Sequence, residues 1–441
     1  MEAPVPEPEY LRTLADGTVK QRNPFTGTEV WTVPGRANRP LGIRRPDPRP
    51  LAPEDAGRHC AFCERRLLET PPEKARVVRR DDGFATLRQV PASQLFATVP
   101  EFRRVPNLFE ILSYDYWHRN HGHELPDDVL RARAAYLAEP EGLRHVLDIV
   151  GRKLRAAGRD EAQVEAMSVE ERLDAASGFF GGGHDVVIAR RHFVDGARDD
   201  TELASSGTLS VGEHRAFLAF TVDAARALAE GIPEATYVAV FQNWLAPAGA
   251  SFDHLHKQLV AIDERGTQQE RALALARRDP DVFNEVALRE AVRHGLVIAE
   301  NAHAIAFAGF GHRYPTIEVY SRSTATVPWE AGPEEIDAMS DVLHAVHAAT
   351  GADVPCNEEW HFRPLDTDTP VPWRIMLKWR VSTIAGFEGA TKIYLNTIDP
   401  VSVRARVLPR LFDLRSRGHV APDLRIGDEC APTPDPLRYA G

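Results

Sequence analysis

Long apolar runs and surplus positive charge are both missing from this 441-residue sequence. No apolar stretch approaches the ~20 residues that cross a bilayer, which excludes a membrane-spanning chain. The N-terminal residues 1–9 lack the basic and apolar parts of a signal peptide, so we expect a soluble, cytoplasmic protein. The formal net charge is −11, from 64 acidic and 53 basic residues, which argues against a nucleic-acid polymer as partner.

Two common phosphate-binding motifs and a disulfide framework are also absent. The sequence contains neither a G-x-G-x-x-G run nor a Walker loop, which removes the usual glycine-rich cradles for phosphate. Its four cysteines are too few to cross-link a chain of this length. Two of them, Cys60 and Cys63, form a C-x-x-C pair. In a reducing cytosol this pair predicts half of a metal site or a redox dithiol.

The remaining composition, 43% hydrophobic and 27% charged, is that of a globular protein with two or three domains. Short runs rich in β-branched residues alternate with helical patterns, and the order strand, strand, helix, strand, strand occurs twice. This predicts an α+β fold of two related halves with antiparallel sheets and flanking helices, 1–263 and 264–441. A helical insertion is expected at about 112–178 in the first half. The main expected strands are 185–189, 237–241, 258–262, 304–307, 316–320, 373–379 and 391–395, and the main expected helices are 212–230, 264–293 and 333–350.

The most informative segment carries polar side chains at every second position, His254, His256 and Gln258. In a strand these three side chains point to one face. Two imidazoles and an amide on one surface suit a site where one ring attacks, the other is fixed and the amide donates to a developing charge. The alternative is a polar strand edge that faces solvent.

The C-x-x-C pair needs two more ligands to complete a tetrahedral zinc site. His254 is one candidate, and His192, which follows the expected strand at 185–189, is another. Together they would form a Cys₂His₂ site from three distant segments. Taken alone, His192 is better explained as a surface histidine that follows two arginines.

Six motifs in the same order resemble the galactose-1-phosphate uridylyltransferase branch of the histidine triad superfamily. The resemblance covers residues ~20 to 400 apart from the insertion, and six ordered motifs are far more specific than one. The motifs are N-P-F-T-G at 23–27 with G-R-A-N-R-P at 35–40, C-A-F-C at 60–63 with T-P-P-E at 70–73, R-V-P-N-L-F at 104–109, G-H-D-V-V-I at 183–188 with His192, F-Q-N at 241–243 with the H-x-H-x-Q strand, and A-G-F-E at 385–388 with T-K-I-Y-L-N at 391–396.

The resemblance implies a function and a role for each matching residue. His256 would attack the α-phosphorus of a nucleotide sugar and form a covalent nucleotidyl-histidine, while Gln258 would hydrogen-bond the phosphate oxygens. Cys60, Cys63, His192 and His254 would hold a structural Zn²⁺ that fixes the strand of His256. The implied substrate contacts are Arg36, Arg39 and Ser251 to phosphate, Asn107 and Asn243 to the nucleotide, and Glu388 to sugar hydroxyls.

The implied activity is transfer of a nucleoside monophosphate from a nucleotide sugar to a sugar 1-phosphate, by a hexose-1-phosphate uridylyltransferase-like homodimer. A phosphorylase that uses inorganic phosphate as acceptor, or a catalytically silent nucleotide-sugar-binding relative, are the alternatives. A simple hydrolase is disfavoured, because Gln258 stands where hydrolytic members carry a third histidine.

Three departures from the family pattern bear on this hypothesis. Leu255 replaces the proline of the usual H-P-H-x-Q run. The H-W-H run of the second half is replaced by Pro372-Trp373-Arg374, which predicts that the second metal of some relatives is absent, with His361 as a remnant of that site. Arg374 would contact the acceptor or form a structural salt bridge. A histidine cluster at 118–123 of the insertion is either a metal or phosphate contact or a solvated loop.

Overall fold

The computed structural model describes residues 9–35, 47–382, 384–431 and 435–440. Within them, twelve strands form one large sheet and four form a smaller one. The large sheet runs in the order β16 (Arg425–Ile426), β10 (Val297–Glu300), β11 (Ala304–Gly309), β12 (Thr316–Ser321), β14 (Arg374–Trp379), β13 (Cys356–His361), β8 (Tyr237–Trp244), β9 (His256–Ile262), β7 (His184–Ala189), β6 (Pro100–Pro106), β4 (Ala75–Arg80) and β5 (Gly83–Arg88).

All neighbouring strands of this sheet are antiparallel, as the α+β prediction requires. The pairing of β8 with β13 joins the strands of the first part of the chain to those of the second. β13 was not among the expected strands. The smaller sheet consists of β1 (Leu11–Thr13), β2 (Val19–Arg22), β3 (Glu29–Thr32) and β15 (Ile393–Leu395).

Some helices pack against the large sheet, whereas those between β6 and β7 form a group with its own core. The helices are α1 (Tyr114–His121), α2 (Asp127–Ala138), α3 (Pro140–Ala156), α4 (Glu161–Glu165), α5 (Val169–Asp174), α6 (Gly178–Gly181), α7 (Val211–Gly231), α8 (Thr267–Arg278), α9 (Arg289–Arg293), α10 (Pro333–Thr350), α11 (Gly386–Thr391) and α12 (Pro400–Ser416). α7 contacts β7, β8 and β9, whereas α10 and α12 contact β11 and β12. None of the helices in the described ranges is long and apolar enough to cross a membrane.

The start of α7 follows from local sequence chemistry. The hydroxyl of Ser210 accepts a hydrogen bond from the backbone N–H of Glu213, and the Glu213 carboxylate accepts one from the N–H of Ser210. This capping box satisfies two donors at the start of the helix. Buried Phe217, Leu218 and Phe220 then attach α7 to the core. The expected helix at 212–230 is therefore confirmed with a shift of one residue at each end.

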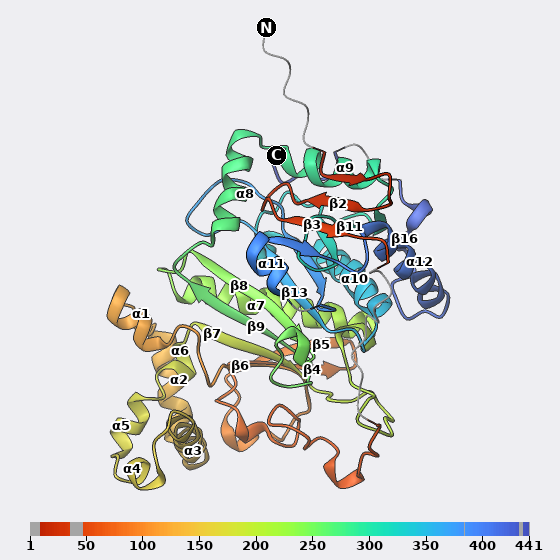
Figure 1. Cartoon of the computed structure of the whole chain (residues 1–441). Coiled ribbons are helices and arrows are strands. Elements are labelled where there is room, and N and C mark those ends of the chain that lie inside the picture. The colour runs from red at the N-terminus through yellow and green to blue at the C-terminus, as the bar shows by residue number, and fades with distance from the viewer. Residues whose placement is uncertain (1–8, 36–46, 383, 432–434, 441) are drawn as a thin grey trace.

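The helices expected as an insertion, α1 to α6, lie between β6 and β7 and gather at the lower left of Figure 1, away from α10 and α12 on the right. They have their own core, which includes Val146, Ile149 and Phe179. His145 attaches this core to the rest of the chain. Its Nε2 donates to the carbonyl of Thr70 at 2.8 Å, so its Nδ1 accepts from the hydroxyl of Tyr136 at 2.7 Å.

One strand prediction needs correction. The run 391–395 was expected to be a strand, but residues up to Thr391 belong to α11 and only Ile393–Leu395 form β15. Lys392 between them adopts a left-handed conformation with φ 59°, which ends the helix before the strand begins.

Candidate active site

Strand register determines which side chains share the face of the sheet that carries His256 and Gln258, here called the His256 face. Gln258 pairs with Val186 of β7 and with Phe241 of β8, and Phe241 pairs in turn with Glu359 of β13. Paired residues of antiparallel strands lie on the same face. Lys257, between His256 and Gln258, points to the opposite face, where its ammonium lies 5.0 Å from the ring of Phe217 in α7. The helices α7 and α10 therefore cover the side opposite the two candidate catalytic residues.

The four expected metal ligands meet at one buried point. Cys60 and Cys63 come from the loop before β4, His192 follows β7, and His254 precedes β9. The two sulfurs are 3.9 Å apart, the two Nδ1 atoms are 3.2 Å apart, and the sulfur–nitrogen distances range from 3.4 to 3.8 Å. A tetrahedral zinc site with its usual bond lengths has edges of about 3.8 Å between sulfurs and about 3.4 Å between nitrogens. The four donor atoms thus have the spacing of a tetrahedral metal site and could hold a metal ion.

The orientation of His254 suits a ligand. Its Nε2 lies 2.6 Å from the carbonyl oxygen of Ala189, and because a carbonyl only accepts, Nε2 carries the proton. Nδ1 is then unprotonated and faces the sulfurs of Cys60 and Cys63. Such a hydrogen bond to the second ring nitrogen is the usual support of a metal-bound histidine. In the structure His254 lies just before the strand and not in it, since β9 begins at His256.

A hydrogen bond to a backbone carbonyl also fixes the ring of His256. Its Nδ1 lies 2.6 Å from the carbonyl oxygen of His254, so Nδ1 donates and the lone pair of a neutral ring is on Nε2. Burial lowers the pKa of His256 to about 4. Within the described ranges Nε2 has no hydrogen-bond partner. The ring packs against Phe62 of the C-x-x-C loop with centroids 5.2 Å apart, and Phe62 contacts Phe252 at 4.6 Å.

A hydrogen-bonded cluster fixes the amide of Gln258. The Nε2 of His184 lies 3.1 Å and the Nδ2 of Asn107 lies 3.3 Å from the Gln258 Oε1. Because the backbone N–H of Ile111 donates to His184 Nδ1 at 3.1 Å, the proton of the neutral His184 ring is on Nε2, where it can be donated to Gln258. Burial lowers the pKa of His184, which favours this neutral form. The amide oxygen of Gln258 is thus occupied by two donors, and its NH₂ group is the part left for another acceptor.

The sequence did not reveal the contact made by His184. The residue belongs to the G-H-D-V-V-I motif, but no role followed from the motif alone. His184 is the first residue of β7 and lies on the same face of the sheet as Gln258 of β9. This position indicates its role, but it can be recognised only when the strand order is known. The T-P-P-E motif has a structural explanation as well, because Glu73 accepts buried hydrogen bonds from Arg76 at 2.7 Å and Arg103 at 3.2 Å.

The remaining expected substrate contacts lie on different elements of the fold. Asn243, on β8, lies beside the nucleophile strand, and its Oδ1 accepts from Asn357 at 2.7 Å. Ser251 is exposed in the loop before β9, which follows Gly249 at φ +90°, a conformation that favours glycine. Glu388 is in α11, where its carboxylate accepts from the N–H of Ala385 at 3.1 Å. Arg36 and Arg39 lie outside the described residues.

The histidines of the insertion do not share one site. His121 contacts Asp263 at 2.8 Å, His123 contacts Glu234 at 3.2 Å, and His118 contacts the carbonyl of His123 at 3.0 Å. They therefore hold α1 against other segments. Among the described residues, the group formed by Cys60, Cys63, His192 and His254 is the cluster with metal-site spacing.

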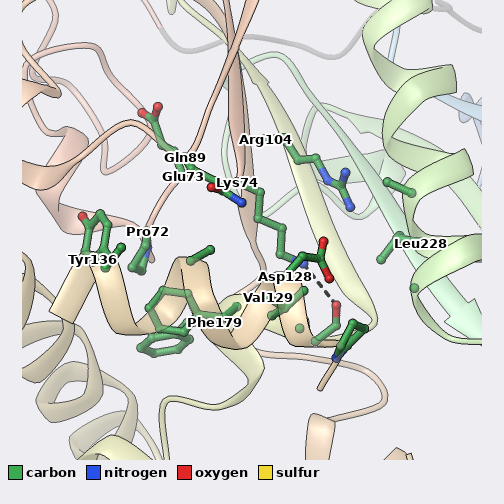
Figure 2. A pocket seen from close by; sticks show the side chains of 18 of the residues that line it. Pro72, Glu73, Lys74, Gln89, Arg104, Asp128, Val129, Tyr136, Phe179 and Leu228 are labelled. Atoms are coloured by element: carbon green, nitrogen blue, oxygen red, sulfur yellow. Dashed lines mark hydrogen bonds between the residues drawn. The ribbon is translucent and has the colours of Figure 1, made fainter. Parts of the chain in front are cut away.

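A cavity of about 490 Å³ lies between the insertion and the main sheet (Figure 2). Lys74 and Arg104 approach it from the sheet side, and Tyr136 and Phe179 from the helices. Both cations contact the buried carboxylate of Asp185, at 2.7 Å and 2.6 Å. Burial opposes the ionisation of Asp185, but the charges of Arg104 and Lys74 outweigh it and lower its pKa. This polar group is paired within the protein, so we assign no ligand to the cavity.

Comparison with known proteins gives one family and several relatives. A family model described as "Domain of unknown function (DUF4921)" matches residues 14–439. ADP-glucose phosphorylase from Arabidopsis thaliana is 25% identical over 181 residues, which cover 38% of this chain and 50% of that protein, so the match spans about half the length of this curated relative.

Two solved structures resemble the whole chain. An ADP-glucose phosphorylase from Arabidopsis thaliana with bound ADP-glucose has a TM-score of 0.55 and 19% identity, and the match covers 88% of this chain and 97% of that one. A GalT-like protein from the same plant has a TM-score of 0.54, with the same identity and the same coverage. These similarities confirm the expected fold, which this chain shares with the two solved structures.

Proposed function

We propose a nucleotidyl-transfer function for this chain, which belongs to the family described as a domain of unknown function, DUF4921. In this proposal, a nucleoside monophosphate moves from a nucleotide sugar to an anionic acceptor through a covalent intermediate on His256. The relative named ADP-glucose phosphorylase and the fold of its ADP-glucose complex support this class of reaction.

The observation that carries the proposal is the fixed tautomer of His256. The carbonyl of His254 accepts the Nδ1 proton at 2.6 Å, which leaves Nε2 with a lone pair that has no other partner in the described part of the chain. An imidazole held in this way is a nucleophile that needs no separate base. In the first step Nε2 forms a bond to the α-phosphorus, and the bond from that phosphorus to the bridging oxygen breaks. The departing sugar 1-phosphate takes the bonding electron pair.

In the second step an acceptor oxygen attacks the same phosphorus, and Nε2 leaves with the electron pair of the broken bond. The Gln258 NH₂ group would donate to a non-bridging phosphate oxygen in both steps, since His184 and Asn107 already occupy its Oε1. Donors placed in advance at developing charge are the largest usual contribution to catalysis. Asn243, Ser251, Glu388, Arg36 and Arg39 remain proposed substrate contacts.

We assign a structural role to the Cys₂His₂ cluster, with Zn²⁺ as the proposed ion, since four protein ligands leave no open position for water. His254 connects the cluster to the reaction, because its ring belongs to the cluster and its carbonyl holds the nucleophile. When bound, the ion supplies a rigid anchor for the residues before β9. The ring of Phe62, between the two cysteines, packs on His256 and excludes water from one side of it.

Intact-protein mass spectrometry tests the proposal. The full chain is incubated with UDP-, ADP-, GDP- and CDP-sugars and kept at mildly alkaline pH, because phosphohistidine bonds are labile in acid. We expect the mass of one nucleoside monophosphate to be added by one donor, and we expect the His256→Ala variant to lose this addition while retaining its zinc content. Zinc-loaded protein that forms no adduct with any donor would favour a silent binding protein, and an adduct that persists in His256→Ala would refute the assigned nucleophile.

Two acceptors are compared directly, inorganic phosphate and a sugar 1-phosphate, because one relative is named a phosphorylase. The isolated adduct is divided and mixed with inorganic phosphate or with glucose 1-phosphate. Release of a nucleoside diphosphate identifies a phosphorylase, and release of a nucleotide sugar identifies a transferase. If the adduct decays at the same rate in buffer alone, neither phosphate nor glucose 1-phosphate is the acceptor.

A further inference from the structure

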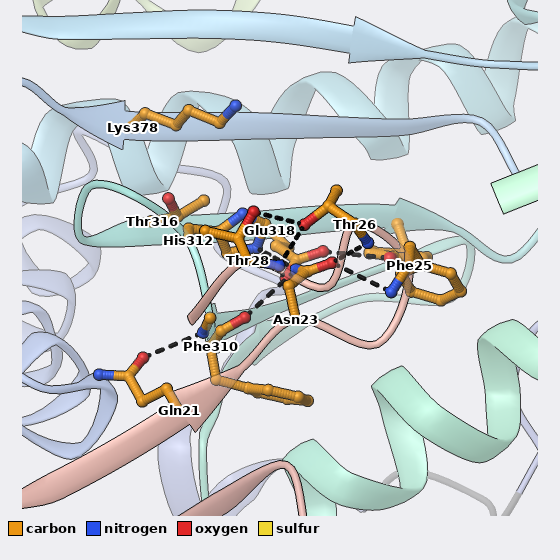
Figure 3. Close-up of polar contacts among 12 residues, drawn as sticks. Gln21, Asn23, Phe25, Thr26, Thr28, Phe310, His312, Thr316, Glu318 and Lys378 are labelled. Carbon is orange, nitrogen blue, oxygen red and sulfur yellow. Dashed lines mark hydrogen bonds and ion pairs between the residues drawn. The ribbon is translucent and has the colours of Figure 1, made fainter. Parts of the chain in front are cut away.

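A second cavity lies on the His256 face, across β8, β13 and β14 from the nucleophile strand. Its volume is about 690 Å³, which is in the range of small-molecule sites. The segment from Asn23 to Thr28 forms one wall of the cavity, where the Oδ1 of Asn23 accepts from the backbone N–H groups of Phe25 and Thr26 and its Nδ2 donates to the carbonyl of Phe310 (Figure 3). Phe241 and Asn243 line the cavity, whereas His256 and Gln258 do not. It is therefore a neighbour of the reaction centre and not the same site.

Four cationic side chains line this cavity, namely Arg313, Arg374, Lys378 and Arg380. Lys378 is paired with Glu359 at 2.5 Å. In contrast, none of the three arginines has a carboxylate within 4 Å among the described residues. The buried carboxylate of Glu318 is bound to His312 at 2.8 Å and to Tyr320 at 3.0 Å. The cavity thus has an excess of positive charge that the described protein groups do not neutralise.

Several nitrogen atoms around the cavity are buried without any hydrogen-bond acceptor. They include the Nε atoms of Arg313, Arg374 and Arg380, although the Nη1 of Arg380 donates to the amide oxygen of Asn357 at 2.6 Å. Only 7% of Arg374 is exposed. Buried donors are nearly always paired in native proteins, so a group of orphaned donors around one cavity points to a missing acceptor. An anion that accepts from guanidinium groups fits this requirement, and phosphate is the group that arginine recognises best.

Aromatic rings line another part of the cavity and could contact an apolar ring of a ligand. Phe25, Tyr314 and Phe362 line the cavity. The guanidinium of Arg380 lies 4.6 Å from the ring of Tyr314, and that of Arg374 lies 4.8 Å from the ring of Phe283. These cation–π contacts keep the arginines in place but offer no acceptor to their N–H groups. A cavity with cations at one part and flat apolar rings at another suits a ligand that carries both a phosphate and a ring.

We propose that this cavity binds a phosphorylated small molecule, either a sugar phosphate or a nucleotide, with its phosphate on Arg374 and Arg380 and its ring against the aromatic lining. This site shares Asn243 with the proposed nucleotidyl-transfer site, but Arg374 and Arg380 are not among the residues assigned to that site. Its position in the sheet is comparable, because Arg374 is the first residue of β14 just as His256 is the first residue of β9.

Isothermal titration calorimetry tests the proposal on the full-length, metal-loaded protein. The probes are glucose 1-phosphate, ADP and inorganic phosphate. We expect glucose 1-phosphate or ADP to bind with a Kd below 1 mM, and we expect Arg380→Met to weaken that binding at least tenfold. Binding of glucose 1-phosphate alone identifies a sugar-phosphate site, and binding of ADP alone identifies a nucleotide site. Inorganic phosphate that binds as tightly as either ester would overturn the assignment of a ring-bearing ligand.

Two control variants separate this site from the others. Arg406→Met removes an equal charge from the exposed side of α12 and should change the Kd less than twofold. Gln258→Ala alters the proposed nucleotidyl site and should also leave the Arg380-dependent binding within twofold. Arg380 is partly exposed, so its replacement is compatible with folding, and the thermal unfolding midpoint verifies this. If no probe binds below 1 mM, or if Arg380→Met and Arg374→Met both bind like the unmodified protein, the proposal is wrong.

Discussion

Replacing Lys257 by methionine should strongly destabilise the protein, because Lys257 forms a fully buried ion pair beneath the nucleophile. Its Nζ lies 2.5 Å from the Oε1 of Glu358, and neither side chain is exposed. Glu358 also accepts from the indole of Trp360 at 2.6 Å and contacts the Nε2 of His347 at 2.7 Å. Burial opposes the ionisation of Glu358, but Lys257 and His347 outweigh it and hold its pKa far below the usual value.

The expected loss of stability follows from the groups that remain when Lys257 is replaced by methionine. The methionine side chain would fill most of the space of the lysine, so the cavity contribution is small and the electrostatic loss dominates. Removing one partner of a buried pair costs about 3–5 kcal/mol, because the other charge stays buried without its partner. Two donors to Glu358 are left, from Trp360 and His347. We therefore expect the lower end, a loss of about 3 kcal/mol in the free energy of unfolding.

Urea unfolding monitored by tryptophan fluorescence measures this loss, with Glu358→Gln and the double variant completing a cycle. If the two charges stabilise each other, the double variant should be at least about 1 kcal/mol more stable than the sum of the single effects predicts. Arg226→Met is the matched control, since it breaks an exposed pair with Glu230 on α7 and should cost less than about 1 kcal/mol. A loss below about 1 kcal/mol for Lys257→Met, or strictly additive effects, would refute the reasoning.

Three further predictions concern the metal cluster, the amide of Gln258 and the response to acid. Cys63→Ser should reduce the metal content measured by mass spectrometry from about one ion per chain to near zero and abolish the His256 adduct; retained metal would remove Cys63 from the ligand set. His184→Phe should lower the rate of adduct formation about tenfold, as expected when a positioned donor loses its support, while the metal content stays unchanged; an unaltered rate would deny His184 its positioning role. The folded-state pKa of Asp185 is lowered, so its contribution to stability is present above the unfolded value of about 3.9 and is lost as the pH falls through and below it. The urea midpoint should therefore drop between pH 6 and pH 3, and less steeply in Asp185→Asn; equal slopes would contradict this assignment.

The sequence predicted the parts of the structure that depend on local patterns. Runs rich in β-branched residues at 258–262 and 316–320 identified two central strands, and the C-x-x-C spacing identified half of the Cys₂His₂ cluster. The candidates for the other half were His192, at the end of an expected strand, and His254, in the H-x-H-x-Q segment. Motifs of this kind carry their geometry in a few consecutive residues, so the sequence suffices to find them.

Features that depend on strand order could not be predicted in this way. β13 has the sequence C-N-E-E-W-H, in which Glu358 points to the helices and Glu359 to the other face, so no apolar alternation marks it as a strand. Glu358 is tolerated in the core only because Lys257, 101 residues away, lies opposite it. The contact between His184 and Gln258 spans 74 residues in the same way. Such pairs become visible only when the register of the sheet is known.

Charge is distributed unevenly over the His256 face, and this bears on how each proposed site would bind an anion. Next to His256, the amide of Gln258 is held by the neutral side chains of His184 and Asn107, while the proposed phosphate contacts Arg36 and Arg39 lie outside the described residues. Arginines that lack a carboxylate partner among the described residues instead line the 690 Å³ cavity. Neutral, oriented donors can stabilise a charge that develops during a reaction without holding the product tightly, whereas guanidinium groups bind a charge that is already present. The first arrangement suits turnover and the second suits retention, which is why removal of the Arg380 charge should impair binding in the cavity and leave formation of the His256 adduct intact.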